Sequence, residues 1–310
     1  PLLARGLWWR MPEAMRSHGV AACLVPSADP HLSEYLPEHW QARQWLSGFT
    51  GSAGTLVVTA DFAGLWTDSR YFEQADKQLA GSGVQLMKLR VPHTPEYMEW
   101  LQQQLHEGDV LAVAGDSLAL GFKRRLQAQL EPVGAVLRSD LDLPAEVWRE
   151  RPSLPHASVL EHALDYAVTA RADKLARLRV AMAEAGASHH FVSALDDIAW
   201  ISNLRGSDVE YNPVFLSHLL IDANGATLFV EATKLDANLQ KMLAGDGIRI
   251  APYSEAGDAL AQLPPDAKLL LAPGQISAAI AHAIPEHVTL TETAGPITSA
   301  KARKSDKEMQ

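Results

Sequence analysis

Apolar residues along the chain fall into short runs that alternate with helical patterns. Runs of strand length, each bounded by turn residues, cover positions 21–25, 54–58, 64–67, 85–88 and 110–113. The segments TADFAG and IDANGAT place Asp, Asn and Gly between two such runs, which predicts a hairpin in each half of the chain. Helical spacing covers YFEQADKQLA, TPEYMEWLQQQL and ADKLARLRVAMAEAG, the last of which ends at Gly186. Strands that alternate with helices predict an α/β fold whose mixed sheets carry helices on their faces.

The pattern of the first half recurs in the second half. WLSGFTGS at 45–52 aligns without a gap on WISNLRGS at 200–207, an offset of 155 residues. LVVTADFAGLWT at 56–67 aligns on LLIDANGATLFV at 219–230, an offset of 163, so the second copy carries eight extra residues, essentially DVEYNPVF at 208–215. The strand-like runs before these blocks are offset by 167. A repeat of this length predicts two tandem domains of one fold, because solenoid repeats run to only about 50 residues.

The predicted boundaries follow from this repeat. Residues 1–152 form the first domain and residues 153–300 the second, and the Pro-rich polar stretch 151–158 is typical of a linker. Residues 301–310 begin a charged helix, for which Ser305 is a suitable N-cap. A helix that begins on the last residues buries nothing, which predicts that this chain is the front part of a longer protein.

Composition and charge exclude several classes of function. The 310 residues carry a formal net charge of −10, and no block of Lys or Arg has the density of a nucleic-acid site. Cys23 is the single cysteine, so no disulfide framework is possible and a cytoplasmic location is expected. No apolar run reaches the roughly 20 residues that cross a bilayer. We therefore expect neither nucleic acid nor a membrane as a partner.

Motifs for a self-sufficient catalytic centre are missing from the chain. There is no HExxH, GxxxxGK[ST], GxSxG or helix-opening GxGxxG. His189 and His190 are neighbours on a predicted strand and point to opposite faces, so they cannot share one metal ion. Asp196 and Asp197 are better placed as a helix N-cap than as an acid/base pair. We expect no catalytic residue and no metal ligand in this chain.

Chemically unusual residues gather in four loops, at positions 29–35, 48–54, 66–72 and 204–215. Any one of these loops has a structural explanation, namely a tight turn with a satisfied ion pair. Four of them in one chain favour a function, because binding groups concentrate on loops that a rigid scaffold holds.

At these loops the sequence resembles a known family. SGFTGSAGTLVVT, LWTDSRYFEQA, ALDDIAWISNLRGSDVEYNPVF and ITSAKARKSDKE resemble, in the same order, the N-terminal part of the three-domain cytosolic type of Xaa-Pro aminopeptidase, also called aminopeptidase P. The resemblance implies two tandem creatinase-like N-terminal domains, and a pita-bread catalytic domain that would begin where this chain ends. That absent domain would hold two divalent metal ions, commonly manganese.

The resemblance also implies a role for particular residues. Arg70 occupies the position of an arginine that family members direct toward the active-site cavity, and His31 and Tyr35 are weaker candidates for contact with substrate. The matching RGSDVxxNPV segment adds four more candidate substrate-binding residues, which are Arg205, Asp208, Tyr211 and Asn212. Individual contacts of that loop do not follow from the sequence.

The implied activity is the release of an N-terminal residue from a peptide whose second residue is proline, by a full-length homodimer in the cytoplasm. This chain alone is expected to be inactive. Two alternatives stay open. Creatinase or prolidase share the N-terminal fold but ordinarily have one such domain, and a non-enzymatic protein-binding module can reuse the fold. The doubled domain and DVEYNPVF favour aminopeptidase P.

Overall fold

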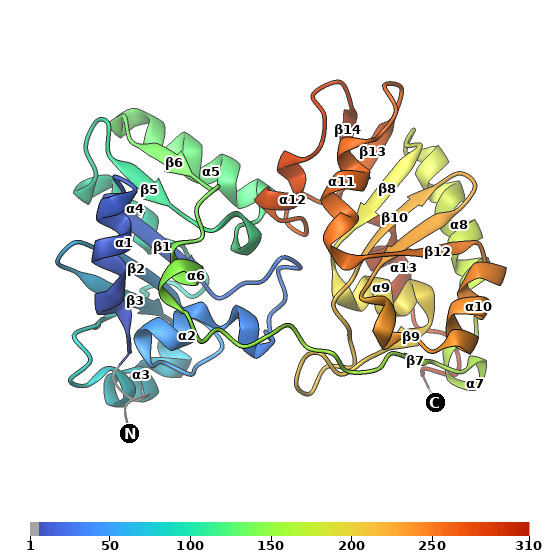
Figure 1. Cartoon of the computed structure of the whole chain (residues 1–310), viewed down its shortest axis with the longest axis horizontal. Helices are drawn as coiled ribbons and strands as arrows, with labels where there is room; N and C mark the ends of the chain where they lie inside the picture. The colour runs from blue at the N-terminus through green and yellow to red at the C-terminus, as the bar shows by residue number, and fades with distance from the viewer. Residues whose placement is uncertain (1–5, 310) are drawn as a thin grey trace. The chain divides into compact units, whose positions relative to one another are not determined.

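The computed structural model describes residues 6–309 and contains two compact units, each built around a six-stranded sheet (Figure 1). Unit 1 comprises the residues up to Asp29, Glu38–Ser153 and Ser277–Ala279. Unit 2 comprises Pro30–Pro37, Leu154–Ile276 and the residues from Ile280 onward. A short segment from the first half of the chain is therefore part of unit 2.

The sheet of unit 1 is mixed and has the strand order β4-β3-β2-β1-β5-β6. Strands β1, β2 and β3 pair antiparallel, and β4, β5 and β6 join parallel to their neighbours. The strands are β1 (Ala22–Pro26), β2 (Thr55–Thr59), β3 (Ala63–Thr67), β4 (Gln85–Lys88), β5 (Val110–Ala112) and β6 (Val136–Arg138). The helices are α1 (Met11–Ser17), α2 (Ala42–Ser47), α3 (Phe72–Leu79), α4 (Glu96–Gln104), α5 (Leu120–Leu130) and α6 (Leu143–Val147).

Alternation along β1 explains why helices cover both faces of this sheet. Cys23 and Val25 belong to one buried cluster, together with residues of α1, α2, α3 and α6. Ala22 and Leu24 belong to another, together with residues of α4 and α5. Because successive strand residues point to opposite faces, a run that is apolar at every position needs a partner layer on each side. The result is a helix–sheet–helix sandwich.

Unit 2 repeats this topology with the strand order β12-β11-β10-β8-β13-β14 and the same pattern of parallel and antiparallel pairs. Its sheet strands are β8 (His189–Val192), β10 (His218–Asp222), β11 (Ala226–Phe229), β12 (Ile248–Ala251), β13 (Lys268–Leu271) and β14 (Thr289–Glu292). A two-stranded ribbon joins β7 (Leu160–Glu161) to β9 (Leu204–Arg205). The helices in the second half of the chain are α7 (Leu164–Ala167), α8 (Arg171–Glu184), α9 (Leu195–Ser202), α10 (Ala237–Gly245), α11 (Ala256–Ala261), α12 (Ala278–His282) and α13 (Pro296–Lys301). The first two residues of α12 belong to unit 1.

The pairing of individual strand residues confirms the internal repeat, with the same offsets as in the sequence. In unit 1, Ala22 of β1 pairs with Thr59 of β2, and in unit 2, His189 of β8 pairs with Asp222 of β10. These pairs are offset by 167 and 163 residues, the two values found from the sequence. The α/β fold with two mixed sheets flanked by helices, and the hairpins β2–β3 and β10–β11, are thus as predicted.

The helix before each hairpin ends in the same way. α2 ends at Ser47 with Gly48 at a φ of 76°, and α9 ends at Ser202 with Asn203 at a φ of 52°. Both positions lie in the left-handed region that closes many helices, which glycine reaches without strain and asparagine tolerates. Trp45 and Trp200, the aligned tryptophans, therefore lie on equivalent helices. The eight extra residues of the second copy follow, between β9 and β10.

One expectation about α9 is wrong. Its N-cap is Ala194 and makes no side-chain cap, and Asp196 and Asp197 lie inside the first turn. Both carboxylates form ion pairs with Lys301 of α13. The helix dipole still stabilises negative charge in the first turn. The direct partner of these carboxylates, however, is a lysine about a hundred residues later in the chain.

Candidate functional site

Arg70 lies just beyond the carboxyl end of β3 and is held by Asp68. The Arg70 Nε and Nη2 atoms donate to the two carboxylate oxygens of Asp68 at 2.9 and 2.8 Å, and the Arg70 backbone N–H donates to Oδ1 at 3.1 Å. Asp68 is buried, whereas 56% of the Arg70 side chain is exposed. The hydrogen bonds from Arg70 lower the pKa of the Asp68 carboxyl. A guanidinium group that is held on one side in this way presents its remaining N–H groups in a fixed direction.

A small polar pocket of about 170 Å³ lies beside this pair in unit 1. Asp68, Thr55, Thr67, His93 and Tyr97 contribute polar groups to its lining. Burial raises the pKa of Tyr97 to about 12, so the phenol stays protonated and can donate. His93 has a φ of 61°, a left-handed conformation that is uncommon for a residue with a side chain. The pocket offers donors and acceptors to one small polar group.

Two charged side chains of the predicted 204–215 loop make hydrogen bonds inside unit 2. Asp208 is buried and its Oδ2 accepts from Lys234 Nζ at 2.5 Å and from the Leu216 backbone N–H at 2.7 Å. Arg205 donates from Nη1 to the carbonyl oxygens of Ala199 at 2.8 Å and Leu204 at 2.9 Å. These hydrogen bonds hold the loop against the rest of unit 2. Arg205 and Asp208 therefore have a structural role, whether or not they also contact substrate.

Tyr211 and Asn212 form the exposed tip of the same loop. A β-bridge between Val209 and Asn212 closes the tip, and Tyr211 has a φ of 61° and is 98% exposed. The neighbouring carboxylate of Glu210 raises the pKa of the Tyr211 phenol. An aromatic side chain in full contact with water is costly to leave uncovered, so this tip is the part of the loop best suited to touch another molecule.

His31 and Tyr35 lie in the segment Pro30–Pro37 of unit 2 and differ in exposure. His31 is buried, with Nδ1 at 2.8 Å from the Ser193 carbonyl oxygen and Nε2 at 2.7 Å from the Tyr253 hydroxyl. A carbonyl needs a donor, so Nδ1 carries the proton and Nε2 accepts from Tyr253. Burial lowers the pKa of the neighbouring His218, whose ring lies 4.6 Å from that of His31. Tyr35 is 54% exposed.

The predicted site residues are thus distributed over both units. Arg70 lies in unit 1, and the other six candidates lie in unit 2. Within unit 2 the structure joins Arg205, Asp208, Tyr211 and Asn212 in one loop, while His31 contacts a different group of residues. Their proposed contact with substrate stays a prediction.

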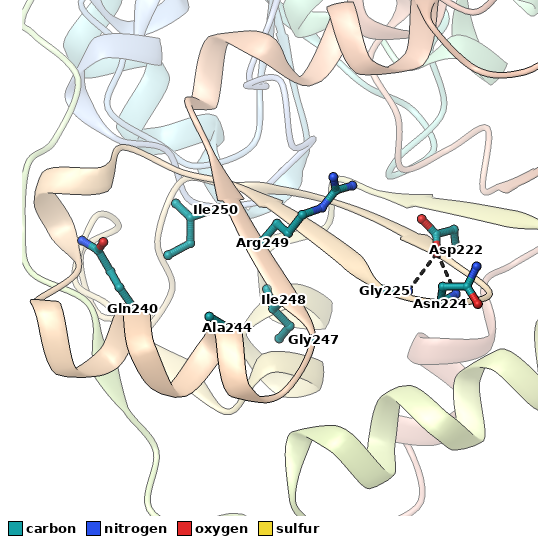
Figure 2. Close-up of a pocket in the computed structure, with 9 residues that line it drawn as sticks. All are labelled: Asp222, Asn224, Gly225, Gln240, Ala244, Gly247, Ile248, Arg249 and Ile250. Carbon is teal, nitrogen blue, oxygen red and sulfur yellow. Dashed lines mark hydrogen bonds between the residues drawn. The ribbon is translucent and has the colours of Figure 1, made fainter.

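A larger hollow of about 700 Å³, which no sequence motif indicates, lies at the edge of the unit 2 sheet (Figure 2). It is bordered by the β10–β11 turn, by α10 and by the edge strand β12. Asp222 Oδ1 accepts from the backbone N–H groups of Asn224 and Gly225 at 2.7 and 2.8 Å, so this carboxylate closes its own turn. The hollow contains no convergent set of titratable groups.

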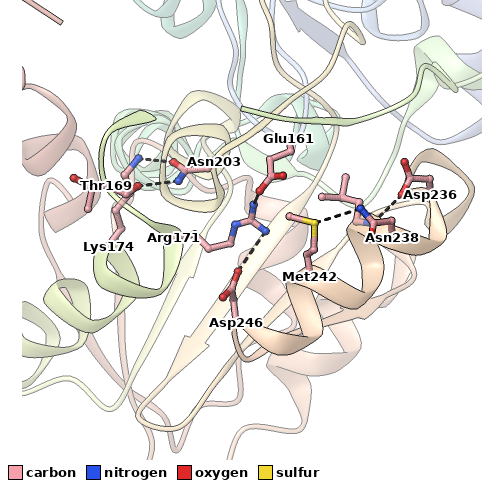
Figure 3. Close-up of polar contacts among 10 residues, drawn as sticks. Glu161, Thr169, Arg171, Lys174, Asn203, Asp236, Asn238, Met242 and Asp246 are labelled. Atoms are coloured by element: carbon pink, nitrogen blue, oxygen red, sulfur yellow. Dashed lines mark hydrogen bonds and ion pairs between the residues drawn. The ribbon is translucent and has the colours of Figure 1, made fainter. Parts of the chain in front are cut away.

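The first turn of α8 holds two charged residues that sequence reasoning missed (Figure 3). Arg171 and Lys174 are both buried, and Arg171 pairs with Glu161 of β7 and, at 3.5 Å, with Asp246 after α10. Lys174 Nζ donates to Asn203 Oδ1 at 2.6 Å. The sequence does contain a signal for the burial of Lys174. Lys174, Leu178 and Ala181 lie at i, i+4 and i+7, which places the lysine on the same face of α8 as apolar residues.

Within residues 6–309, no three His, Cys, Asp or Glu side chains lie close enough together to hold a metal ion. No helix in that range is both long and apolar enough to cross a membrane.

Comparison with known proteins decides the family. Models of the creatinase/prolidase N-terminal domain match residues 10–142 and residues 150–308. The chain belongs to the creatinase/prolidase N-terminal domain family. Its two units are therefore two domains of creatinase-N type, as the resemblance implied.

Two relatives by sequence are named as aminopeptidases P. Aminopeptidase P2 of Arabidopsis thaliana is 37% identical over 268 residues, which cover 84% of this chain and 37% of the relative. A probable Xaa-Pro aminopeptidase P of Ajellomyces dermatitidis is 33% identical over 317 residues, covering 97% of this chain and 51% of the relative.

A solved structure agrees with these sequences. The X-prolyl aminopeptidase of Caenorhabditis elegans, described as a cytosolic enzyme with a di-nuclear active site, superposes with a TM-score of 0.87 at 30% identity. The match covers 94% of this chain and 48% of that protein. The chain thus spans about half the length of the relatives it matches, or less.

Proposed function

We propose that this chain is the N-terminal, non-catalytic region of a Xaa-Pro aminopeptidase. The full-length protein would hydrolyse the bond between an N-terminal residue and a following proline. The observation that carries the proposal is the match to the X-prolyl aminopeptidase of Caenorhabditis elegans, which accounts for 94% of this chain but 48% of that protein. The domain boundaries we propose are 1–152 and 153–300, with 301–310 leading toward a catalytic domain.

The two metal ions of such an enzyme, manganese by resemblance, would be held outside the residues described here. A hydrolytic metal centre needs three or more converging protein ligands, and no such group exists among residues 6–309. These residues therefore do not fit a two-metal centre, and we assign no chemical step to them.

The role of this chain in catalysis would be to position the peptide. Proline has no backbone N–H and fixes its φ, so a proline-containing substrate offers few donors and depends on contacts to its carbonyl oxygens. Arg70 can supply such contacts, because Asp68 fixes one side of its guanidinium while more than half of the side chain stays exposed. The tip at Tyr211 and Asn212 is the second candidate contact. A cytoplasmic location and a full-length homodimer belong to the same proposal.

The experiment compares this chain with the full-length protein encoded by the same gene. Each is incubated with manganese and with two peptides that differ only in proline or alanine at the second position. We expect the full-length protein to release the first residue of the proline peptide alone, and the 310-residue chain to release nothing. Hydrolysis by the isolated chain, or equal cleavage of both peptides by the full-length protein, would refute the proposal.

A further inference from the structure

A cavity of about 360 Å³ lies in unit 2 where α8, the end of α9 and α13 meet. Its size is within the range of small-molecule sites, about 300 to 1,000 Å³. Its lining combines basic and apolar residues, among them Lys174, Arg177, Trp200, Ile201, Ile297 and Arg303. None of the predicted site residues lines this cavity, although the motifs WISNLRGS and ITSAKARKSDKE contribute to its wall.

Positive charge dominates the rim, although the chain as a whole carries a net charge of −10. Four basic side chains line the cavity against the single carboxylate of Glu308. Arg177 and Arg303 have no side-chain hydrogen bond or ion pair with any residue in the range 6–309, and both are exposed. Two guanidinium groups without a partner beside one cavity are an electrostatic site for an anion.

Glu308 offsets only one of the four positive charges that line the cavity, and its carboxylate oxygen is also used in a neighbouring turn. Its Oε2 accepts from the Ser305 backbone N–H at 2.8 Å and from the Ser305 hydroxyl at 3.0 Å. The Glu308 backbone N–H donates in return to Ser305 Oγ at 3.3 Å. This reciprocal pattern is a capping box, in which the carboxylate satisfies backbone donors.

Lys174 supplies a cation deeper in the cavity and in a fixed position. Its Nζ donates to Asn203 Oδ1 at 2.6 Å (Figure 3). The same Nζ donates to the Trp200 carbonyl oxygen at 2.8 Å and lies 4.2 Å from the centre of the Trp200 ring. Asn203 is fixed in turn by donating to the Thr169 carbonyl oxygen at 2.9 Å. Two of the three ammonium protons are therefore used in hydrogen bonds, and the positive charge is fixed beside the Trp200 ring at the cavity wall.

The interior of the cavity is apolar. Leu178, Ile201 and Ile297 are buried, and Trp200 is half-buried. An inorganic anion would gain nothing from these side chains. A ligand with an apolar body would bury surface against them, which stabilises binding by about 25 cal/mol for each Å² removed from water.

From this combination we propose that the cavity between α8 and α13 binds a small organic anion with a flat apolar body, of which an arylalkyl carboxylate is the simplest example. The body lies on the surface formed by Trp200, Ile201 and Ile297, and the carboxylate faces Arg177, Arg303 and Lys174. Nucleotides fit poorly, because no glycine lines the cavity to give the close backbone approach that a phosphate cradle needs.

The test uses the 310-residue chain and three probes of equal size. These are 4-phenylbutyrate, its neutral amide 4-phenylbutyramide and the cationic 4-phenylbutylamine, each titrated by isothermal calorimetry at low salt. We expect the carboxylate to bind about tenfold or more tightly than the amide, and the amine not to bind, since the difference is one charge-assisted hydrogen bond. Added salt should weaken binding of the carboxylate.

Charge-removing variants locate the site. We expect Arg177→Gln and Arg303→Gln each to weaken binding of 4-phenylbutyrate about three- to tenfold. Lys241→Gln, which removes an exposed cation of α10 in the same unit, is the matched control and should leave binding unchanged. Ala181→Phe should also abolish binding by filling the cavity while the charges remain, and thermal melting checks that this variant folds.

Three outcomes would overturn the proposal. The first is equal binding of the carboxylate and the amide, or no binding of either at about 10 mM. The second is an effect of Lys241→Gln as large as that of Arg177→Gln, which would indicate a diffuse electrostatic attraction. The third is unchanged binding by a folded Ala181→Phe variant, which would place the ligand elsewhere.

Discussion

Asp208 and Lys234 form a buried ion pair that fixes the loop inserted in the second repeat. Lys234, the last residue of the short helix η7 (Ala232–Lys234), donates from Nζ to Asp208 Oδ2 at 2.5 Å, and the two side chains are 3% and 0% exposed. The second oxygen of Asp208 has no hydrogen-bond partner among the described residues. The pair is therefore held by one strong contact and by burial.

We expect that breaking this pair destabilises the protein strongly. Asp208→Asn leaves a buried ammonium without its carboxylate, which costs about 3 to 5 kcal/mol of unfolding free energy. Lys234→Met leaves the carboxylate uncompensated, with a similar cost. The double variant should recover part of the loss, because neither charge remains buried alone. Urea unfolding of the three variants measures this coupling, and single-variant losses below about 1 kcal/mol would show that the pair is not buried in solution.

Arg70→Ala in the full-length enzyme should lower kcat/KM for Xaa-Pro substrates about ten- to a hundredfold. The loss of one charge-assisted hydrogen bond to the peptide corresponds to roughly 1.5 to 3 kcal/mol. Arg70→Lys should restore part of the activity, because it keeps the charge but not the fork. Steady-state kinetics well below the melting temperature give the answer.

A matched control for Arg70 exists in the same unit. Arg138 donates from Nε and Nη2 to both oxygens of Asp140, at 3.1 and 2.5 Å, and so repeats the geometry of the Arg70–Asp68 pair on the surface. Arg138→Ala should leave kcat/KM unchanged. If Arg70→Ala has no greater effect than Arg138→Ala, the Arg70–Asp68 pair is a structural surface pair only.

Acid should destabilise unit 2 through His190. The ring Nδ1 of His190 lies 2.9 Å from the Leu270 carbonyl oxygen, and burial lowers its pKa from 6.5 to about 4. Between these values the unfolded chain binds a proton that the folded chain does not, so stability is lost as pH falls from about 6.5 toward about 4. The loss from this group approaches about 3 kcal/mol at the lower limit.

Urea unfolding at about pH 7 and about pH 5 tests this prediction. His190→Asn, whose amide can still donate to the carbonyl oxygen, should reduce the difference in unfolding free energy between the two pH values. His189→Asn alters the neighbouring strand residue, whose side chain points to the other face of the sheet, and serves as the control. An unchanged pH dependence in His190→Asn would contradict the assignment.

Alkaline pH should weaken anion binding at the proposed cavity. Burial, and then the charge of Arg205, lower the pKa of Lys174 from 10.5 to about 8. The ammonium is therefore lost as pH rises through about 8, and binding of 4-phenylbutyrate should fall about threefold or more between about pH 7 and about pH 9. Calorimetry in buffers of different ionisation enthalpy should detect proton uptake on binding near pH 8. A Lys174→Met variant should lack both effects, and their persistence in that variant would exclude Lys174 as their cause.

The strands of the fold could be predicted from the sequence because hydrophobic alternation and turn residues are local signals. The run 85–88 was predicted and β4 is Gln85–Lys88, and the other early strands differ from their predicted runs by one residue at either end. The repeat added the topology, since the offsets 167 and 163 are those of the paired strands β1–β2 and β8–β10. Hydrophobic alternation and turn residues act over a few positions, so one sequence is enough to show them.

The site was less predictable because its partners lie far apart in the chain. Asp208 is one charged residue of a polar loop in the sequence, and only the fold places Lys234, 26 residues later, against it. Lys174 was missed for the converse reason. A lysine in an amphipathic helix is ordinarily solvated, and only the fold brings Trp200 and Asn203 against it. Tertiary contacts, and not residue type, decide whether a charged side chain is buried in an ion pair, lines a cavity or is solvated.

Two copies of one topology in a single polypeptide create a hazard during folding, because equivalent strands offer the same hydrogen-bonding edges to either sheet. His190 of β8 takes the position that Cys23 holds in β1, where the surroundings are apolar. A β8 strand inserted into the sheet of unit 1 would place the larger imidazole among the apolar side chains that pack around Cys23, and overpacking of this kind costs about 1 to 3 kcal/mol. Divergence of the two copies at buried positions thus guards the chain against mispaired intermediates of the kind that tandem repeats produce.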